Sequence, residues 1–280
     1  MARSFLDAWM PGCLDAWMPF DMLSPSAIQR MFQYLAPRYD LWNRLASCYL
    51  DEYWRRRAVA FIRPGSRVLD LCTGTGELLL KMLPRLGPSG QAVGLDFASN
   101  MLAIAVRKTR ARARSTQGSP AYLLGDATAL PFPADTFDCL TNGFAMRNLL
   151  PCADRVLSEM WRVLRPEGRV IILDMCRPES PFLERLYGWH LRWVLPAQAR
   201  LLYRSGQPFQ YLKDSIGEFP PPDEFRRQLA WHGFTEVTFM PLSAGIAGIF
   251  TGVKGPRRAN VPLARTGSRM APEQLTPSAE

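Results

Sequence analysis

The sequence predicts an α/β fold built on a doubly wound, mostly parallel sheet of seven strands. Between residues 67 and 175, short apolar runs rich in leucine, valine and isoleucine alternate with amphipathic stretches of helical period. Continuous apolar strands separated by helices are typical of a parallel sheet that is covered on both faces. The last two apolar runs have no helix between them, which indicates an antiparallel hairpin at one edge of the sheet.

Each element follows from a local pattern. Apolar runs predict strands at 67–71, 91–96, 121–124, 137–142, 169–175, 235–242 and 246–254. Amphipathic stretches predict helices at 77–86, 99–114 and 152–164, with further helices within 28–60. Residues 176–225 interrupt this alternation with an insertion rich in aromatic residues. We expect the insertion and the N-terminal helices to form a helical lid over the carboxyl ends of the strands, where such Rossmann-like sheets bind ligands.

The chain divides into one folded domain, at 28–255, and two tails. The segment 1–27 contains the hexapeptide LDAWMP twice, at 6–11 and 14–19. Two copies are too few for a repeat architecture, so we interpret this segment as a flexible arm with a local duplication. Residues 256–280 are rich in arginine and proline and poor in apolar residues, which predicts a disordered basic tail.

Composition argues against several protein classes. We find no run of about 18 uncharged apolar residues that would span a membrane, and the N-terminus lacks the pattern of a secretory signal. The six cysteines are scattered and the histidines number two, so we expect reduced thiols and no metal site. These features favour a cytoplasmic protein.

The net charge of +9 comes mostly from arginine. The densest basic run, at 107–114, follows a helical pattern, and we interpret it as the solvated end of a helix. Basic charge also suits anionic lipid surfaces and nucleic acid. Peripheral contact with the inner face of a membrane is therefore an alternative that the composition leaves open.

The stretch LDLCTGTGELL, at 69–79, predicts a strand that ends in a tight turn and opens a helix. Gly74 and Gly76 permit the turn and bring amide N–H groups to a helix N-terminus, where polar or anionic ligands bind. The fingerprint of dinucleotide sites needs a third glycine, but that position is Leu79. The carboxylate of Glu77 suits a cation better than a pyrophosphate. S-adenosylmethionine carries an ammonium and a sulfonium and has no phosphate.

Two later strand ends agree with this ligand. Asp96 ends the second strand, at the place of the acid that accepts ribose hydroxyls. Asp126 and Ala127 end the third strand, where the aspartate can accept from an adenine amino group and the alanine can back the ring. A single aspartate at a strand end is as often a helix N-cap as a ligand-binding residue. The prediction therefore depends on these residues occurring in order at the ends of successive strands. The predicted cofactor site comprises Asp70, Thr73, Gly74, Gly76, Glu77, Asp96, Phe97, Met101, Asp126, Ala127 and Asn142.

Longer motifs are far more specific than the glycine turn. They include MFQYLAPRYDLWNRLAS (31–47), YWRRR (53–57), GLDFASNML (94–102), GDATALPFPADTFDCLT (125–141), GFAMRNL (143–149) and FQYLKDSIGEFPPPDEF (209–225). With these motifs the chain resembles, from about 28 to 255, the quinone C-methyltransferase family of menaquinone and ubiquinone biosynthesis. The N-terminal block retains Tyr39, Asp40, Asn43, Ser47, Trp54 and Arg55.

The resemblance implies that S-adenosylmethionine methylates a ring carbon of demethylmenaquinol or a ubiquinone precursor. The acceptor would carry a polyprenyl tail, and a homodimer is possible. A hydroquinone carbon becomes nucleophilic when the adjacent hydroxyl loses its proton. We expect Arg147 to stabilise that oxyanion and not to act as a base, because a guanidinium stays protonated. Residues expected to hold the hydroxyls or a proton-carrying water are Asn148, Tyr211, Ser215 and Tyr39.

Each of the predicted catalytic residues discussed next can instead have a purely structural role. Arg147 can pair with a structural acid, and Tyr39 can be an ordinary packing residue of a helix. Tyr211 and Ser215 are four residues apart, so they can share a buried helix face. We expect Trp189 and Trp193 to belong to the core of the lid, with a membrane interface as the alternative. The two histidines, His190 and His232, are interpreted as structural.

The chain departs from the family pattern at three places. Glu77 stands where the family has aspartate, and Asp174-Met175-Cys176 stands where it has Glu-Phe-Ser. The stretch after Arg147-Asn148 is one residue longer. These departures leave open another small aromatic or polyketide acceptor, or another modification of a quinone, and a non-catalytic scaffold is a third class.

A nucleic-acid methyltransferase is disfavoured. Enzymes that methylate base amino groups carry an Asn/Asp-Pro-Pro-aromatic turn after the fourth strand, where this chain has NGFA at 142–145. Cytosine C5 enzymes use a cysteine after proline as the nucleophile. Pro151-Cys152 fits that pair in isolation, but it lies about ten residues past the strand end, so we expect no nucleic-acid partner.

Overall fold

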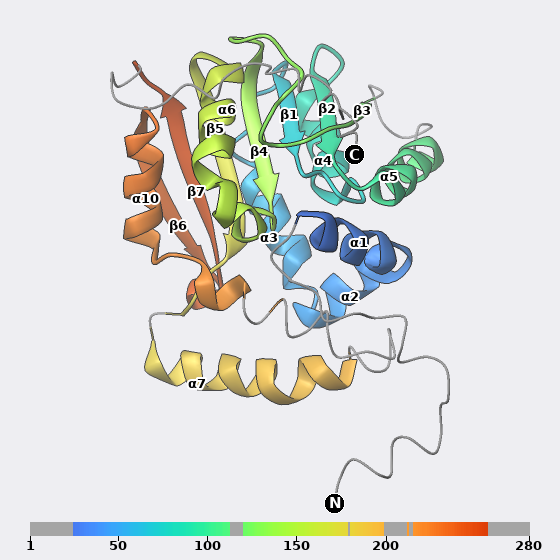
Figure 1. The fold of residues 1–280 in the computed structure, drawn as a ribbon, viewed down its shortest axis with the longest axis vertical. Coiled ribbons are helices and arrows are strands. Elements are labelled where there is room, and N and C mark those ends of the chain that lie inside the picture. Colours follow the sequence, from blue (N-terminus) through green and yellow to red (C-terminus); the bar gives the residue numbers. More distant parts are fainter. Residues whose placement is uncertain (1–24, 113–119, 179, 199–211, 213–214, 257–280) are drawn as a thin grey trace, which may run out of the picture.

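The computed structural model describes residues 25–112, 120–178, 180–198, 212 and 215–256. Within these residues, seven strands form one sheet in the order β3-β2-β1-β4-β5-β7-β6 (Figure 1). The strands are β1 (Arg67–Leu71), β2 (Gln91–Asp96), β3 (Ala121–Leu124), β4 (Phe137–Gly143), β5 (Leu164–Met175), β6 (Phe234–Leu242) and β7 (Ala247–Lys254). The first five pair in parallel, and β7 runs antiparallel to β5 and β6. The doubly wound sheet and its C-terminal hairpin are confirmed.

The helices also follow the predicted segments. They are α1 (Pro25–Leu35), α2 (Tyr39–Ala46), α3 (Leu50–Val59), α4 (Glu77–Leu86), α5 (Ser99–Arg112), α6 (Ala153–Val163), α7 (Pro181–Trp189) and α10 (Pro222–Trp231). Short turns of other helix types are the 3-10 segments η1 (Ala36–Arg38), η2 (Met146–Cys152) and η4 (Ser243–Gly245), and the π-helical segment η3 (His190–Val194). The largest difference in a boundary is at β5, which begins at Leu164 and not at residue 169, while β4, β6, β7 and α6 differ from the predicted bounds by one residue at one end or both.

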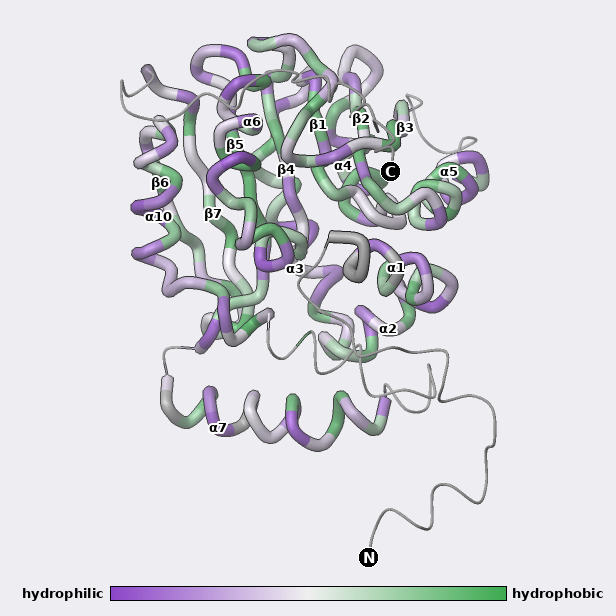
Figure 2. Tube along the Cα trace, in the orientation of Figure 1, coloured by the Kyte–Doolittle hydropathy of each residue, from purple (hydrophilic) through white to green (hydrophobic). Residues whose placement is uncertain are grey.

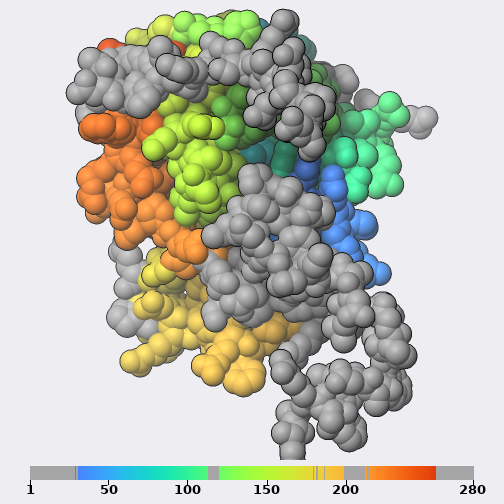
Figure 3. Space-filling view, viewed as in Figure 1, coloured from blue at the N-terminus to red at the C-terminus, as the bar shows by residue number. Residues whose placement is uncertain are grey.

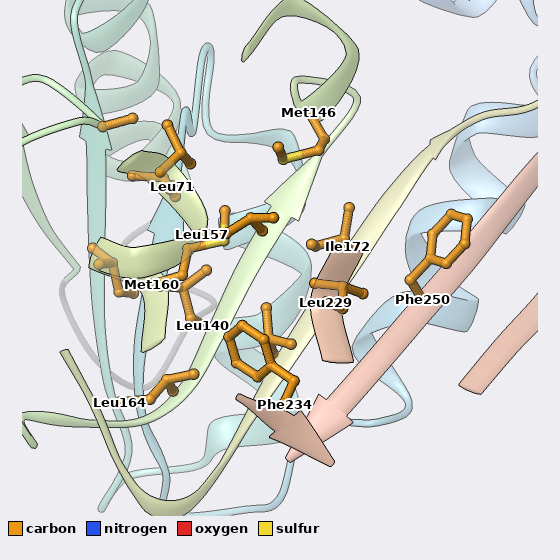
Figure 4. Packing of buried hydrophobic residues seen from close by; sticks show 14 of the residues in the cluster. Leu71, Leu140, Met146, Leu157, Met160, Leu164, Ile172, Leu229, Phe234 and Phe250 are labelled. Atoms are coloured by element: carbon orange, nitrogen blue, oxygen red, sulfur yellow. The ribbon is translucent and has the colours of Figure 1, made fainter. Parts of the chain in front are cut away.

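Apolar side chains pack on both faces of the sheet. Figure 4 shows one cluster, in which Leu140, Ile172, Met160, Leu229 and Phe250 bring β4, β5, α6, α10 and β7 together. A second cluster joins α3 and α4 to the other face. The hydropathy colouring in Figure 2 follows this arrangement, with hydrophilic residues frequent on the outer sides of α5 and α10. Each fully buried leucine or phenylalanine stabilises the fold by about 1.5–3 kcal/mol, so this double cover fixes the positions of the strand ends.

Several predictions fall wholly or partly outside the described residues. The LDAWMP duplication within 1–24, the tail from residue 257 and Tyr211 belong to this group. The insertion is described at residues 176–178, 180–198, 212 and 215–225. One expectation for it is wrong, because Trp189 and Trp193 are not core residues but are 57% and 61% exposed. Within the described residues, no helix is both long and apolar enough to cross a bilayer.

Candidate active site

The turn between β1 and α4 requires its glycines. Gly74 and Gly76 have φ of +56° and +79°, in the left-handed region where a side chain is strained. A Cβ on Gly76 would lie 3.1 Å from both the Ala105 Cβ and the Tyr122 hydroxyl. The missing side chain therefore lets the start of α4 approach α5 and β3 closely.

The amides of this turn are not directed at a ligand, which corrects the prediction. The Gly74 N–H donates to Asp96 Oδ2 at 2.7 Å, and the Gly76 N–H donates to the Thr73 carbonyl at 2.9 Å. The turn closes on itself and on the end of β2 because the buried Asp96 carboxylate needs donors. Its remaining lone pairs are still available to a ligand hydroxyl.

A cavity of about 380 Å³ lies beside this turn, and we call it the cradle cavity. Its lining residues are Tyr39, Arg55, Asp70, Cys72, Thr73, Gly74, Thr75, Glu77, Leu78, Gly143 and Phe144. Two of them are carboxylates, Asp70 and Glu77, and Asp96 lies directly behind Gly74. Such a lining suits a ligand with positive charge more than one with phosphates.

Asp70 is held by two hydroxyl donors. Thr73 Oγ1 donates to its Oδ2 and Thr141 Oγ1 donates to its Oδ1, both at 2.6 Å. Burial raises the pKa of the Asp70 carboxyl to about 6, although these hydrogen bonds oppose the rise. At neutral pH the Asp70 carboxylate is therefore ionised, and a positive charge nearby would stabilise it.

Glu77 faces a cation that belongs to the protein. Lys108 Nζ lies 2.6 Å from Glu77 Oε1 and 2.5 Å from Asp40 Oδ2, while Arg44 Nη2 lies 3.7 Å from Glu77 Oε2. Thr75 Oγ1 donates to Asp40 Oδ1 at 2.6 Å. Burial raises the pKa of the Glu77 carboxyl, but the hydrogen bond and charge of Lys108 outweigh it, so the pKa is lowered. These contacts fasten α2 to the start of α4 and to the C-terminal half of α5.

The residues after β2 pack against α1. Asp96 Oδ1 accepts the Ala98 N–H at 2.9 Å. The Phe97 ring meets Phe32 edge to face at 6.4 Å, and Gln29 Nε2 donates to the Phe97 carbonyl at 2.6 Å. Met101 is buried in the same small cluster. Neither Phe97 nor Met101 lines the cradle cavity.

The last three predicted cofactor residues divide between surface and core. Asp126 is exposed, and its Oδ1 accepts the Thr128 N–H at 2.8 Å, the local capping that a strand-end aspartate often makes. Ala127 is buried. Asn142 is fully buried, and its Nδ2 donates to the Leu71 carbonyl at 3.0 Å. Asn142 therefore joins the ends of β1 and β4, and it does not line the cradle cavity.

A second cavity of about 470 Å³ lies among α2, α3, the end of β4 and η3, and we call it the inter-helix cavity. Its lining is largely apolar with a few charged groups. The lining residues are Asn43, Ala46, Ser47, Asp51, Trp54, Arg55, Phe144, Arg147, Met175, Tyr187, Leu195, Leu212 and Ile216. Arg55 and Phe144 line both cavities, so the two spaces share a wall.

The shared wall is a stacked pair. The Arg55 guanidinium lies 5.0 Å from the centre of the Phe144 ring, over its face. Phe144 has φ of +59°, which is rare for a bulky residue, and its N–H donates to the Leu173 carbonyl at 2.7 Å. Strain of this kind is kept where surrounding structure enforces it, frequently at functional sites. The Trp54 ring packs at 6.1 Å from Phe144 and donates its Nε1–H to Ser243 Oγ.

Each cavity-lining arginine is held by a buried carboxylate. Arg55 pairs with Asp51, whose Oδ1 also accepts the Ser47 hydroxyl at 3.0 Å. Arg147 Nη1 donates to Asp174 Oδ1 at 2.6 Å, and the Arg147 backbone N–H donates to Asp174 Oδ2 at 3.0 Å. Arg147 therefore pairs with a structural acid and also lines the inter-helix cavity.

The other predicted catalytic residues have different surroundings. Tyr39 is largely buried in the cradle cavity wall, and its hydroxyl is hydrogen-bonded to the Asn43 side chain. Burial raises the pKa of Tyr39, and the charges of Arg147 and Arg55 oppose the rise. Asn148 lies in η2 and Ser215 donates to the Leu212 carbonyl at 3.0 Å. Neither of these two lines a cavity, and Tyr211 lies outside the described residues.

Sequence reasoning assigned no role to Asp51, Phe144 or Asp174. Asp51 and Arg55 are four residues apart on α3, and this spacing of opposite charges is a signal that was available. Asp174 was noted as a departure from the family pattern but not as the partner of Arg147. The left-handed backbone of Phe144 could not be predicted, because phenylalanine is not a residue that favours this conformation.

The nucleophile expected of a cytosine C5 enzyme is absent from both cavities. Cys152 ends η2 and its thiol contacts the Leu149 carbonyl at 3.3 Å. Burial raises the pKa of this thiol, which disfavours the thiolate that such chemistry needs. His190 and His232 bond to Ala46 and Asp154, away from the shared wall.

Comparison with known proteins adds independent information. The model of the ubiE/COQ5 methyltransferase family matches residues 21–254. A Geobacter sulfurreducens protein, "Ubiquinone/menaquinone biosynthesis C-methyltransferase UbiE", is 40% identical, with 81% of this chain and 88% of the relative covered. A Thermus thermophilus "Demethylmenaquinone methyltransferase" is 41% identical, with 79% and 99% covered.

Among solved structures, a Thermotoga maritima SAM-dependent methyltransferase described as a possible histamine N-methyltransferase is similar in fold. The TM-score is 0.55 at 20% identity, and the match covers 81% of this chain and 99% of the other. An identity this low supports the fold alone.

Proposed function

The chain belongs to the ubiE/COQ5 methyltransferase family, and from this premise we propose that it methylates a ring carbon of a quinol. It is an S-adenosylmethionine-dependent methyltransferase, and its relatives carry the names of C-methyltransferases of quinone biosynthesis. The observation that carries the proposal is the pair of cavities with one shared wall: an acidic one at the strand ends and a largely apolar one with two guanidiniums.

The cradle cavity fits S-adenosylmethionine by charge and shape. Asp70, Glu77 and Asp96 supply carboxylates, which suit its positive charges. The cofactor has no phosphate, so it needs no phosphate-binding group. Gly74 and Gly76 keep the turn free of side chains. When bound, this cofactor supplies an electrophilic methyl group. In this proposal Asp96 accepts ribose hydroxyls and Glu77 faces the amino acid part, where Lys108 and Arg44 limit the charge that Glu77 offers.

The inter-helix cavity fits an aromatic acceptor. Trp54, Phe144, Met175, Leu195 and Ile216 offer apolar surface for a ring and the start of a tail. An acceptor hydroxyl that loses its proton places negative charge on oxygen. Guanidiniums fixed in advance stabilise such charge without reorganisation, and a lost donor of this kind typically costs about 100-fold or more in rate.

The two arginines suit an acceptor with two oxygens. Arg55 and Arg147 are each anchored by a buried carboxylate, Asp51 and Asp174, so neither guanidinium needs a new partner to remain in place. Both charges act on the Tyr39 hydroxyl, which places all three groups near one another. We assign Arg55 and Arg147 to the two ring oxygens of a hydroquinone, with the Tyr39 hydroxyl as a neutral hydrogen-bond donor.

The proton of the acceptor hydroxyl needs a base. Among the described residues, Asp51 is the carboxylate that lines the inter-helix cavity. We assign to Asp51 the removal of this proton, with its Oδ1 held by the Ser47 hydroxyl and its Oδ2 by Arg55. After the methyl group has moved from the sulfonium to the ring carbon, leaving S-adenosylhomocysteine, loss of the proton on that carbon restores the aromatic ring. A carboxylate within hydrogen-bond reach of the reacting hydroxyl is the geometry that general base catalysis requires.

The acceptor can also differ from the quinols of the relatives. Asp174 and Met175 belong to the three-residue segment that departs from the family pattern, and both lie at the inter-helix cavity. A departure at this wall affects the acceptor and leaves the cradle cavity unchanged. A small aromatic or polyketide acceptor is therefore the second candidate.

Methyl transfer to purified acceptors tests the proposal. The protein is incubated with labelled S-adenosylmethionine and a reduced short-tail analogue of demethylmenaquinone, of the ubiquinone precursor, or of a tail-free dihydroxyarene. We expect label in the ring carbon of a quinol. Cofactor binding without transfer to either quinol would refute the quinol assignment, and transfer to the tail-free arene alone would favour the second candidate.

The normal acceptor is expected to carry a polyprenyl tail and hence to reside in a bilayer. We therefore propose that the enzyme takes its acceptor from a membrane surface, as a peripheral protein. The basic net charge of +9 supports this proposal.

A further inference from the structure

We propose that the outward face of α7 and η3 docks the enzyme on an anionic lipid bilayer, while the inward face of the same segment lines the inter-helix cavity. The inference rests on the proposed quinol-methylating function and names the surface through which the acceptor arrives. We call this outward face the α7 face, and define it by Phe182, Arg185, Trp189, Arg192 and Trp193.

Large aromatic side chains form one stripe of the α7 face. Phe182, Trp189 and Trp193 are 73%, 57% and 61% exposed. Their spacing of seven and four residues places them on one side of a helix. Three large aromatic rings in one exposed stripe are costly in water, and they mark an interaction site.

Arginines flank this stripe. Arg185 and Arg192 are exposed, and the Arg192 guanidinium lies 5.7 Å from the centre of the Trp193 ring. Tryptophan and arginine together are the side chains that settle at the boundary between headgroups and acyl chains. The arginine charges complement anionic lipid headgroups. A second copy of this chain would instead bring like charges together across the contact.

The inward side of the same segment belongs to the acceptor site. Tyr187 and Leu195 line the inter-helix cavity, and Leu191 packs in the cluster of Leu35, Trp42 and Leu195. His190 Nε2 bonds to the Ala46 carbonyl at 3.0 Å, which ties η3 to α2. One helical segment therefore separates the cavity from the aromatic stripe.

The position of α7 in the molecule agrees with docking. In Figure 1 the arrow of β4 points towards α1–α3 and α7, and α7 lies at that end of the molecule. Figure 3 shows the yellow and orange-yellow atoms of this region in the lower left part of the view. A surface at this end can approach a bilayer without interference from α10 or β3, which lie elsewhere in the fold.

Vesicle sedimentation with the full chain tests the docking. Vesicles of phosphatidylglycerol and phosphatidylcholine in equal parts are compared with vesicles of phosphatidylcholine alone. We expect the wild type to bind the anionic vesicles, and the double variant Trp189→Ala, Trp193→Ala to bind about tenfold more weakly or worse. The matched control is Trp231→Ala on α10, because Trp231 is also an exposed tryptophan, at 53%. It should bind like the wild type.

Charge is tested separately. The variant Arg185→Gln, Arg192→Gln should also lose about tenfold or more in binding to the anionic vesicles, because a basic residue near an anionic surface contributes about 1 kcal/mol. Equal wild-type binding to both vesicle types, or unchanged binding by the tryptophan variant, would overturn the proposal. Dissociation of a dimer by that variant, with vesicle binding unchanged, would assign the α7 face to a second copy instead.

Turnover separates this inference from the proposed function. With a water-soluble, short-tail quinol and no vesicles, the tryptophan variant should turn over like the wild type. With a long-tail quinol in anionic vesicles it should be slower, in step with its weaker binding. Loss of turnover on the short-tail quinol as well would mean that the variant damages the cavity, and would contradict an independent docking face. If no quinol is methylated by the wild type, the proposed function fails while the vesicle results stand.

Discussion

The cradle cavity and the inter-helix cavity share a wall, but the chain builds them differently. Most of the cradle lining comes from one continuous stretch, at 70–78, at the end of one strand and the start of the next helix. The inter-helix cavity takes its lining from α2, α3, the segment after β4, the end of β5, α7, the residue after η3 and the segment before α10. One site is thus a local property of the chain, and the other exists only when distant helices pack.

This difference predicts that substitutions in the two cavities affect different properties. Changes in the cradle should affect cofactor binding and stability, because the cradle is part of the sheet. Changes in the inter-helix cavity should affect turnover, because its side chains face the acceptor. The four predictions below test this division.

The largest effect is expected within the cradle, at Gly76. Alanine there must adopt φ of +79° and bring its Cβ to 3.1 Å from two neighbours, whereas alanine at Gly74 meets nothing within 4 Å. We expect Gly76→Ala to lower the free energy of unfolding by about 2–4 kcal/mol, and Gly74→Ala by about 1–2 kcal/mol. Denaturant unfolding measures both, and equal losses would show that close packing against α5 is unimportant.

The next effect is expected in the inter-helix cavity, at Arg147. Lysine retains the charge opposite Asp174 but loses the planar fork of donors. We expect Arg147→Lys to lower kcat by about 100-fold, with the Kd of S-adenosylmethionine changed by less than about threefold. Arg165→Lys, in an exposed pair with Asp138, is the control and should be silent. A parallel loss of cofactor affinity would place Arg147 in the cradle.

The third prediction uses pH and returns to the cradle. The pKa of Asp70 is raised from 3.8 to about 6 in the fold, so the folded chain binds this proton more tightly than the unfolded chain. The contribution to stability is complete below about pH 4 and is lost as pH rises through about 6, at a cost of about 3 kcal/mol. In Asp70→Asn this decline should disappear. Unfolding free energies measured between pH 4 and 7 give the comparison, and identical slopes would contradict it.

The smallest effect is expected at Tyr39, which lines the cradle cavity together with the shared-wall residues Arg55 and Phe144. Phenylalanine keeps the ring contact with Phe32 but removes the hydroxyl bonded to Asn43. A neutral hydrogen bond of this kind contributes about 0.5–1.5 kcal/mol, so Tyr39→Phe should lower kcat by about tenfold. The exposed Tyr53 provides the matched control, Tyr53→Phe. Unchanged kcat in Tyr39→Phe would leave this hydroxyl a packing role only.

The sheet was predictable because each strand carries its own signal. The runs at 67–71, 91–96 and 121–124 match the observed β1, β2 and β3 at both ends. Burial on two faces selects uninterrupted apolar residues, and glycines mark the turn that follows β1. Four residues of the cradle lining lie within these signals and were predicted from the sequence, namely Asp70, Thr73, Gly74 and Glu77.

The inter-helix cavity was only partly predictable, for a physical reason. Its charged residues are paired in three dimensions. Arg147 and Asp174 are 27 positions apart in the chain, and no sequence pattern indicates that they pair. The left-handed backbone of Phe144 is imposed by its surroundings and not by its residue type. Exposure of Trp189 and Trp193 likewise depends on which side of η3 meets α2.

The shared wall of Arg55 and Phe144 also constrains how a new acceptor can evolve. A substitution in that wall changes the acceptor cavity and the donor cavity together. Selection for a new substrate at this wall therefore acts on acceptor binding and on cofactor binding at the same time. Met175, Leu195 and Ile216 contact the inter-helix cavity and do not line the cradle. A library directed at these three positions can explore acceptor scope while inheriting an intact donor site.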